Sequence, residues 1–310
     1  MGIDRRRIVI SDPPHKLEKR VRILFFSAAV LSVVVTVGIV AVLLVDSVVF
    51  FKNVSLWDFM MGSEWAPTIK PYRYGVLPIL SGTVTFTLTT ALIALPVGLL
   101  TAVFLAEYAP PRLRAVLKPA LEILAGIPTV VYGYFALVYV TPFLRNFFPD
   151  ISTFNVLSAS IVVAIMIIPT ISSISEDAIR AVPDKLRYGA YGLGMTRFQT
   201  IRTVVLPSAL SGITSSFILG ISRVIGETMA VTIAAGRMPR IVNLLNLSDT
   251  FLKPIQTMTS AMVEVGLSDV SGDSPAYMSL YAVGFLLFLF TLALNLISQK
   301  IKKKFREKYQ

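Results

Sequence analysis

An arginine and a glutamate stand four residues apart, at Arg223 and Glu227, inside an apolar run long enough to cross a bilayer. A charged side chain at the centre of a bilayer costs about 2.5 to 3.5 kcal/mol, so neither is expected to face lipid. Two interpretations follow. Either the side chains form a permanent ion pair that fixes helix packing, or Arg223 binds an anion and Glu227 holds Arg223 when the anion is absent.

Threonines recur in an earlier apolar run, where Thr83, Thr87 and Thr90 fall on one helical face. Their hydroxyls could line a hydrated path, with Thr83 and Thr87 as the candidate residues. The alternative is that each hydroxyl bonds the carbonyl four residues earlier in its own helix or packs between helices.

Small residues repeat every four positions in the run that contains Arg223, at Ser208, Gly212, Ser216 and Gly220. Such a stripe lets a second helix approach closely. The simplest partner for it is a helix of another chain.

Several kinds of chemistry are excluded by composition. The chain has no cysteine, so disulfides, zinc–thiolate sites and thiol nucleophiles are ruled out. Its single histidine, His15, leaves no cluster for a metal or for acid–base catalysis. The Gly-x-x-x-x-Gly-Lys-Ser/Thr pattern that cradles nucleotide phosphates does not occur. We therefore expect no catalytic residue, no metal site and no cofactor on this chain.

The elements that must position these residues are membrane helices. Hydrophobic residues make up 55% of the 310 positions and charged residues only 15%, which indicates an integral membrane protein. A helix needs about 20 apolar residues to span a bilayer. The segments of that length are Ile23–Val45, Ile79–Ala106, Pro119–Val140, Val156–Ile174, Leu210–Ala234 and Tyr277–Ile297. The expected fold is an all-α, polytopic membrane protein with six transmembrane helices.

Charge sets the expected orientation. Seven Lys and Arg lie in the tail 1–22 and six in the tail 299–310, and the loops on the side of these tails are also basic. That side carries about three times as many Lys and Arg as the other, which places both termini in the cytoplasm. The first helix, 23–45, is expected to be a permanent anchor rather than a cleaved signal. Nucleic-acid binding is disfavoured, because the basic residues lie in tails and loops rather than on one polar face.

Two of the loops expected on the other side of the membrane are distinctive. The loop 46–76 contains Trp57, Trp65, Tyr72 and Tyr74, which suit a headgroup belt or a surface that meets an outside partner. The loop 236–276 is long and apolar. Its segment Leu252–Val265 is expected to form a short interfacial or re-entrant helix.

A polar loop, 176–207, interrupts the core region 77–298 on the cytoplasmic side. Pro183 suits a helix start and Gly194 a helix stop, and Thr196 with Gln199 forms a capping box for a second helix. Tyr188 and Tyr191 share a face of the first helix, which suits the docking of a soluble partner or contact with lipid headgroups.

The same loop resembles the coupling loop of ATP-binding-cassette (ABC) importer permeases, with its pattern Glu-Ala-Ala, three residues, Gly, nine residues, Ile, one residue, Leu-Pro. Here Tyr188, Gly189 and Ala190 stand where Glu-Ala-Ala would be, Gly194 follows, and Leu206 and Pro207 close the pattern. Three further segments, FLAEYAPP from Phe104, GIPTVVYGYFAL from Gly126 and GETMAVTIAAG from Gly226, resemble the PstC-type subunit of phosphate importer permeases.

That resemblance implies a permease subunit of an ATP-driven phosphate importer in a prokaryotic plasma (inner) membrane. Its implied partners are a second, PstA-type permease, an ATPase dimer that binds ATP and Mg²⁺, and an extracytoplasmic phosphate-binding protein. Arg223 would then neutralise translocating phosphate, while the helix from Pro183 to Gly194 would receive the motion of the ATPase. A permease for molybdate or sulfate, a secondary transporter and a membrane scaffold remain the alternatives.

Overall fold

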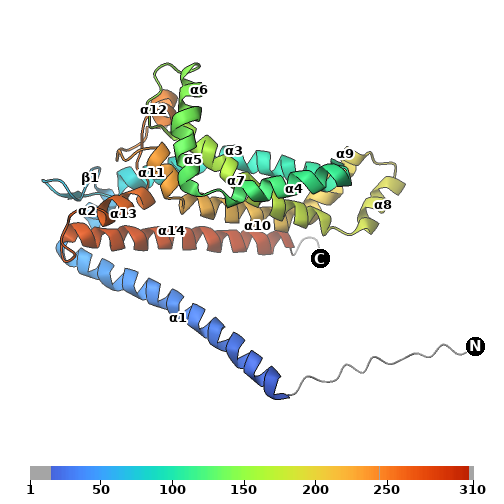
Figure 1. Ribbon diagram of the computed structural model, residues 1–310, viewed down its shortest axis with the longest axis horizontal. Coiled ribbons are helices and arrows are strands. Elements are labelled where there is room, and N and C mark those ends of the chain that lie inside the picture. Colours follow the sequence, from blue (N-terminus) through green and yellow to red (C-terminus); the bar gives the residue numbers. More distant parts are fainter. Residues whose placement is uncertain (1–14, 244, 307–310) are drawn as a thin grey trace, which may run out of the picture.

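The computed structural model describes residues 15–243 and 245–306, and it shows a bundle of long helices (Figure 1). Parts of both basic tails, 1–14 and 307–310, lie outside the described residues. The all-α class is confirmed, since the strands of the described part form one short antiparallel hairpin. The elements are α1 (His15–Asn53), α2 (Leu56–Met61), β1 (Trp65–Ala66), β2 (Arg73–Tyr74), α3 (Leu77–Val103), η1 (Phe104–Tyr108), α4 (Pro111–Gly126), α5 (Thr129–Phe135), η2 (Ala136–Val140), α6 (Thr141–Arg145), α7 (Val156–Arg180), α8 (Asp184–Gly192), α9 (Arg197–Thr200), η3 (Ile201–Val205), α10 (Leu206–Ile225), α11 (Met229–Ala234), α12 (Leu247–Leu252), α13 (Met258–Gly266) and α14 (Pro275–Arg306).

Five helices of the described part are long and apolar enough to cross a membrane: Glu18–Asn53, Leu77–Tyr108, Val156–Arg180, Arg197–Ile225 and Pro275–Ile297. They run side by side along the long axis in Figure 1, except that α1 diverges. The third expected span, Pro119–Val140, is not a straight helix. It divides between two helical segments, Pro111–Gly126 and Thr129–Arg145, that are bent by 92° relative to each other.

The bend between α4 and α5 has a local cause. α4 ends at Gly126, and Pro128 follows in an extended conformation with no backbone N–H to continue the helix. The Tyr132 hydroxyl then donates a hydrogen bond of 2.7 Å to the carbonyl of Leu124 on the other side of the bend. As a result, α6 projects away from the bundle (Figure 1).

The fifth expected span, Leu210–Ala234, is wrong at both ends. α10 stops at Ile225, and the short helix α11 begins only at Met229. The span begins much earlier than expected, at Arg197, because α9, η3 and α10 follow one another without a break.

α7 is the central helix of the bundle. Its Ile171 is fully buried and lies within 3 Å of where a Cβ would stand on Gly98 of α3 and on Gly220 of α10. A Cβ on Gly212 would similarly meet the side chain of Ala178, again on α7. The stripe of small residues on α10 therefore packs against α7 of the same chain. The expectation that it meets a helix of another chain is wrong at these two glycines.

The two ends of the bundle differ. One end carries α8, and we call it the α8 end. The opposite end, called the hairpin end, carries α2, the β1–β2 hairpin and α13 (Figure 1). There Trp65 pairs with Tyr74 across the hairpin and is buried in a cluster with Phe50 and Phe59. The expected helix in 252–265 is present as α13.

α1 touches the bundle mainly near its C-terminal end. Phe50 of α1 is buried in one cluster with Val283 of α14, and Leu43 lies close to Gly284. Toward its N-terminal end α1 diverges from α14 (Figure 1), and its apolar residues there are exposed. In a membrane protein, such a surface is available to lipid or to another chain.

Candidate functional site

Arg223 lies in the last turn of α10 with its side chain exposed. Its Nη1 donates a hydrogen bond of 3.2 Å to the hydroxyl oxygen of Thr170 on α7. Thr170 lies a little past the midpoint of α7, so Arg223 reaches the middle of a membrane-length helix. A guanidinium next to a neutral hydroxyl keeps its full charge and has donors left over for an anion.

Glu227 lies beyond the end of α10 and is buried, with 8% of its surface exposed. Its carboxylate accepts a hydrogen bond from the backbone N–H of Ala230 at 3.2 Å, in the first turn of α11. Its carbonyl accepts another from the hydroxyl of Thr259 at 2.9 Å. Among the residues that the structure describes, no ion pair joins Glu227 to Arg223. The two do not stand one turn apart on a helix, because α10 ends between them.

Thr83 is buried and fully engaged. Its hydroxyl donates to the carbonyl of Ile79 at 2.7 Å and accepts from the backbone N–H of Met258, at the start of α13, at 2.9 Å. The structure thus gives Thr83 a packing contact between α3 and α13 and does not bring it to Arg223. Thr87, one turn further along α3, is buried too, and its hydroxyl has no hydrogen-bond partner in the described part of the chain.

The polar loop folds as helix, glycine turn and helix. α8 begins one residue after Pro183 and ends at Gly192. Gly194 has a φ of +81°, a left-handed conformation that glycine adopts without strain. The N–H of Met195 bonds the carbonyl of Ala190 at 3.1 Å, and that of Gly194 bonds the carbonyl of Tyr191 at 2.9 Å. These bonds close the end of α8 as a Schellman motif.

The second helix of the loop starts as expected at the capping box of Thr196 and Gln199, where each side chain bonds the other residue's backbone N–H. A π-helical turn, η3, leads into α10, and there the N–H of Leu206 bonds the carbonyl of Ile201. Pro207 comes directly afterwards and has no N–H to donate. The wider turn suits this proline, because its ring would crowd the carbonyl of an ordinary helical turn.

The outer face of α8 is aromatic and apolar. Tyr188 is 70% exposed, and Tyr191, on the same face, is exposed as well. Ala190, on the other side of the helix, is buried. Leu186 and Leu193, near the two ends of α8, are also exposed. A Cβ added at Gly189 would meet nothing within 4 Å, so this position tolerates the alanine that the family pattern carries.

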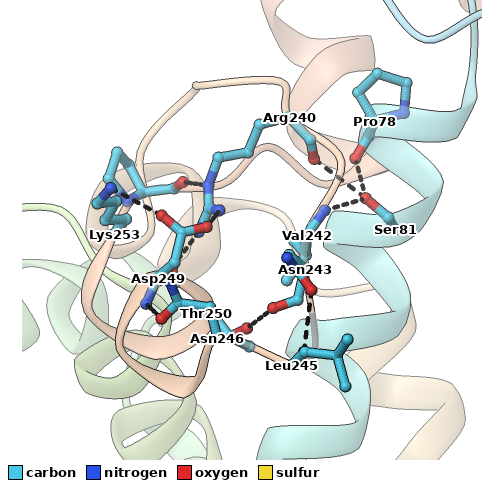
Figure 2. A network of polar contacts seen from close by, with 11 residues as sticks. Pro78, Ser81, Arg240, Val242, Asn243, Leu245, Asn246, Asp249, Thr250 and Lys253 are labelled. Atoms are coloured by element: carbon cyan, nitrogen blue, oxygen red, sulfur yellow. Dashed lines mark hydrogen bonds and ion pairs between the residues drawn. The ribbon is translucent and has the colours of Figure 1, made fainter.

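A polar network at the hairpin end pins the loop that follows α11 (Figure 2). The guanidinium of Arg240 binds the Asp249 carboxylate at 2.6 Å and the carbonyl of Pro254 at 2.8 Å. Lys253 binds the same carboxylate at 2.8 Å. The Ser81 hydroxyl of α3 donates to the Arg240 carbonyl at 3.1 Å. The hydrogen bond from Lys253, with the charge of Arg240, holds the pKa of Asp249 below its ordinary value.

The aromatic residues expected on the outer loop divide into two kinds. Trp65 and Tyr74 belong to the packed hairpin. Trp57 and Tyr72 are exposed and line a hollow of about 690 Å³ between α2 and the hairpin. The structure thus leaves the first pair with a packing role and the second pair available to a partner or to headgroups.

Sequence reasoning missed several residues near these sites. Thr170, the partner of Arg223, carries no local signal, since it is one of many hydroxyls in apolar helices. Glu107, Glu176 and Arg187 meet ion partners at the α8 end. Glu176 could have been noticed, because a carboxylate directly after an apolar segment needs a partner once it is buried.

Comparison with known proteins matches this chain to one family. The family model described as "Binding-protein-dependent transport system inner membrane component" matches residues 94–307. The matched region includes the bend after α4, the polar loop with α8, and Arg223.

Among relatives, the "Probable ABC transporter permease protein YqgH" of Bacillus subtilis (strain 168) is 34% identical over 303 residues, which cover 96% of each chain. The "Phosphate transport system permease protein PstC" of Xylella fastidiosa (strain Temecula1 / ATCC 700964) is 35% identical over 262 residues, covering 78% of this chain and 77% of that protein. The protein of the same name in Mesorhizobium japonicum is 33% identical over 291 residues, with 88% and 86% covered.

Solved structures share the fold. A bacterial ABC transporter chain involved in alginate import superposes with a TM-score of 0.62 at 14% identity, covering 94% of this chain and 99% of that one. A chain of the MetNI methionine ABC transporter in an inward-facing conformation gives 0.56 at 18% identity, covering 72% and 92%. From the family match and the relatives together, the chain belongs to the inner-membrane components of binding-protein-dependent transport systems.

Proposed function

We propose that this chain is the PstC-type permease subunit of an ATP-driven importer of inorganic phosphate, and that it forms half of the translocation path. The observation that carries the proposal is Arg223, an exposed guanidinium in the last turn of α10, hydrogen-bonded to the neutral Thr170 near the middle of α7. Phosphate carries between one and two negative charges near neutral pH, and arginine binds such oxyanions through two parallel N–H donors. The relatives named as phosphate permeases support the same substrate.

Glu227 supports this path indirectly. Its carboxylate caps α11, and its carbonyl binds Thr259 next to the start of α13. It therefore fixes the break after α10 and leaves the Arg223 guanidinium free of a carboxylate. In the absence of phosphate, the Thr170 hydroxyl occupies one Arg223 donor, which is the role that the sequence suggested for Glu227.

The proposed partners follow from the same assignment. A second, PstA-type permease would supply the other half of the path, and an extracytoplasmic phosphate-binding protein would deliver the substrate at the hairpin end. An ATPase dimer would bind ATP and Mg²⁺, because this sequence has no nucleotide-binding loop of its own. Both termini and α8 would then lie in the cytoplasm, in keeping with the excess of basic residues on that side.

The docking element for the ATPase is α8. Its exposed Tyr188 and Tyr191 rings give a rigid aromatic face of the kind that anchors protein interfaces. Because Tyr188 stands where the family pattern has a glutamate, the contact depends on packing rather than on a carboxylate. Gly192→Cys in this otherwise cysteine-free chain tests the contact and keeps both rings: a bound ATPase should protect the thiol from a maleimide.

Uptake of labelled phosphate by the assembled complex in proteoliposomes tests the path. Arg223→Ala should lower uptake by about tenfold or more, since a hydrogen bond to a charged group contributes about 1.5 to 3 kcal/mol. Arg223→Lys should keep part of the uptake, because it keeps the charge but not the two parallel donors. Arg145→Ala, at an exposed arginine of α6 outside every ion pair of the described residues, is the matched control.

Three results would contradict the proposal. Wild-type uptake by an assembled Arg223→Ala complex would remove Arg223 from the path. Uptake of sulfate or molybdate but not phosphate by the unmodified complex would show that the substrate is another oxyanion. Uptake without ATP and without the ATPase would indicate a secondary transporter.

A further inference from the structure

Arg187 of α8 is an enclosed arginine at the α8 end, with 13% of its side chain exposed. Its guanidinium donates to the carbonyl of Ile179 at 2.8 Å and to the carbonyl of Val182. It also binds the Glu107 carboxylate, at 3.1 Å from Nη2, and Asp184 of its own helix at 3.2 Å. One side chain thus uses all three of its nitrogens on four partners.

The partners of Arg187 are the ends of two membrane helices. Ile179 and Val182 lie at the C-terminal end of α7, where carbonyls have no partner within the helix and a positive charge is favourable. Glu107 belongs to η1, the last turn of the span that begins with α3, and its side chain is 8% exposed. Arg187 therefore connects α8 to α3 and to α7 at once.

A second ion cluster connects α4 to the same helix. Glu176 of α7 is fully buried, and its carboxylate meets Arg114 and Lys118 of α4, the latter at 3.6 Å. Lys118 also lies 3.5 Å from Asp177, the next residue of α7. Both clusters border one cavity of about 750 Å³, so their charges share a solvent-reachable space at the α8 end.

These contacts continue into the proposed path. α7 receives Arg187 at its C-terminal end and carries Thr170 nine residues before Ile179, which is about 14 Å along a helix. Thr170 holds Arg223. A displacement of α8 that is delivered to the end of α7 therefore reaches the Thr170–Arg223 contact through a single packed helix.

We propose that Arg187 is a positioning residue that fixes α8 to the adjoining ends of α3 and α7, and that these ends form one rigid body with α4, which the Glu176 cluster holds to α7. Through this body the ATPase moves α7 and with it the partner of Arg223. The proposal rests on the proposed function for the identity of the motor and of the cargo. It does not rest on phosphate for the connection itself, which can be measured separately.

Spin labels test the connection, because the chain has no cysteine to remove. Labels at Lys185→Cys on α8 and Val116→Cys on α4 give a first distance, inside the proposed body. Labels at Lys185→Cys and Leu296→Cys on α14 give a second distance, between the body and a helix outside it. In the assembled complex we expect the first distance to be unchanged by ATP and the second to change. Adding Arg187→Ala should make the first distance change with ATP as well. The proposal is overturned if ATP changes the first distance in the complex that keeps Arg187, or if ATP never changes the second distance.

The ratio of phosphate transported to ATP hydrolysed tests the consequence. Arg187→Ala should lower this ratio by about tenfold, since it removes the bonds that hold α8 to the ends of α7 and α3. Arg187→Lys should lower it less, because an ammonium keeps the charge but cannot span two carbonyls and a carboxylate. Arg112→Ala is the matched control, at an exposed arginine of α4 that forms no ion pair within the described ranges.

Folding defects are separated from uncoupling by the same ratio. A purely structural role would reduce the amount of complex while the ratio in the remaining complex stays at the parent value, and that result overturns the proposal. If Arg187→Ala does not assemble, the same ratio is measured for Glu107→Gln, which keeps a hydrogen-bond acceptor, and the same two outcomes apply. If the parent complex transports no phosphate, the proposed function is wrong, while the label distances still report on the rigid body.

Discussion

Arg223 and Arg187 have opposite environments in the fold. Arg223 lies exposed against a hydroxyl, whereas Arg187 is enclosed by two carbonyls and two carboxylates. A guanidinium that is already saturated can hold other elements in place but cannot take a ligand. One with open donors can bind an oxyanion. This difference in saturation is why we assign substrate binding to Arg223 and positioning to Arg187.

Asp249 gives the hairpin end a dependence on pH. Its pKa is lowered by the hydrogen bond from Lys253 and by Arg240, so the folded loop favours the ionised carboxylate. The resulting stabilisation is complete above the ordinary carboxyl value of 3.8 and is lost as the pH falls through the lowered pKa. Hydrogen exchange of residues 240–253, corrected for intrinsic rates, should show this loss of protection on acidification.

Asp249→Asn serves as the control for that measurement. It removes the charge, so protection of the loop should be lower at neutral pH and should show no transition near the carboxyl range. Equal protection of the parent and Asp249→Asn at neutral pH would mean that the ion pairs drawn in Figure 2 do not hold the loop.

Local signals in the sequence predicted local geometry well. Gly194 as a helix stop and the capping box of Thr196 are both confirmed, because each depends on residues within one turn. Contacts across the fold were not accessible in this way. The pairing of Arg187 with Glu107 joins residues that are 80 positions apart, and no spacing rule relates them.

At the scale of elements, α8 is a short helix, and a glycine within it and a glycine after its end have different roles. Gly194 needs its left-handed conformation, so Gly194→Ala should destabilise the turn by about 1 to 2 kcal/mol. Gly189 lies in the helix with open space around it, so Gly189→Ala should stabilise α8 by about 0.5 to 1 kcal/mol. Limited proteolysis between α7 and α9 measures both, with faster cleavage expected for the first variant and slower cleavage for the second. The same cleavage rate in both variants would contradict this assignment.

The bend after α4 shows what a hydropathy pattern can and cannot predict. The pattern correctly found an apolar run from Pro119 to Val140, since apolar composition reports length in a membrane. It does not report direction. Gly126 and Pro128 form a helix-ending signal, and an apolar run that is counted by length alone does not register it. The break after Ile225 was missed for the same reason.

For the whole molecule, the orientation can be tested with single cysteines. Tyr188→Cys on α8 and Tyr72→Cys near the hairpin lie at opposite ends of the bundle and are both exposed. An impermeant thiol reagent added outside intact cells should label position 72 only. Position 188 should be labelled only after the cells are permeabilised, so that the reagent reaches the cytoplasmic side. Labelling of position 188 from outside would reverse the proposed topology.

Exposed apolar residues over much of the surface fit a subunit of a larger assembly. α4 has no buried residue, and Tyr134, Tyr139 and Phe143 on the projecting arm after the bend are exposed. A membrane protein can present such residues to lipid or to another helix bundle. Within the proposed complex, the second permease would cover part of this surface.

The contact between α1 and α14 joins the first and last membrane helices of the chain. The contact of Leu43 with Gly284, and the packing of Phe50 in one cluster with Val283, therefore form only after that part of α14 has been synthesised. At about 5 to 20 residues per second, the ribosome needs on the order of tens of seconds to cover that interval. α1 must survive this delay in the bilayer by its own insertion energy, and it is the most apolar of the five spans. The high apolar content of α1 therefore suits a helix that must stay in the membrane until α14 is synthesised and packs against it.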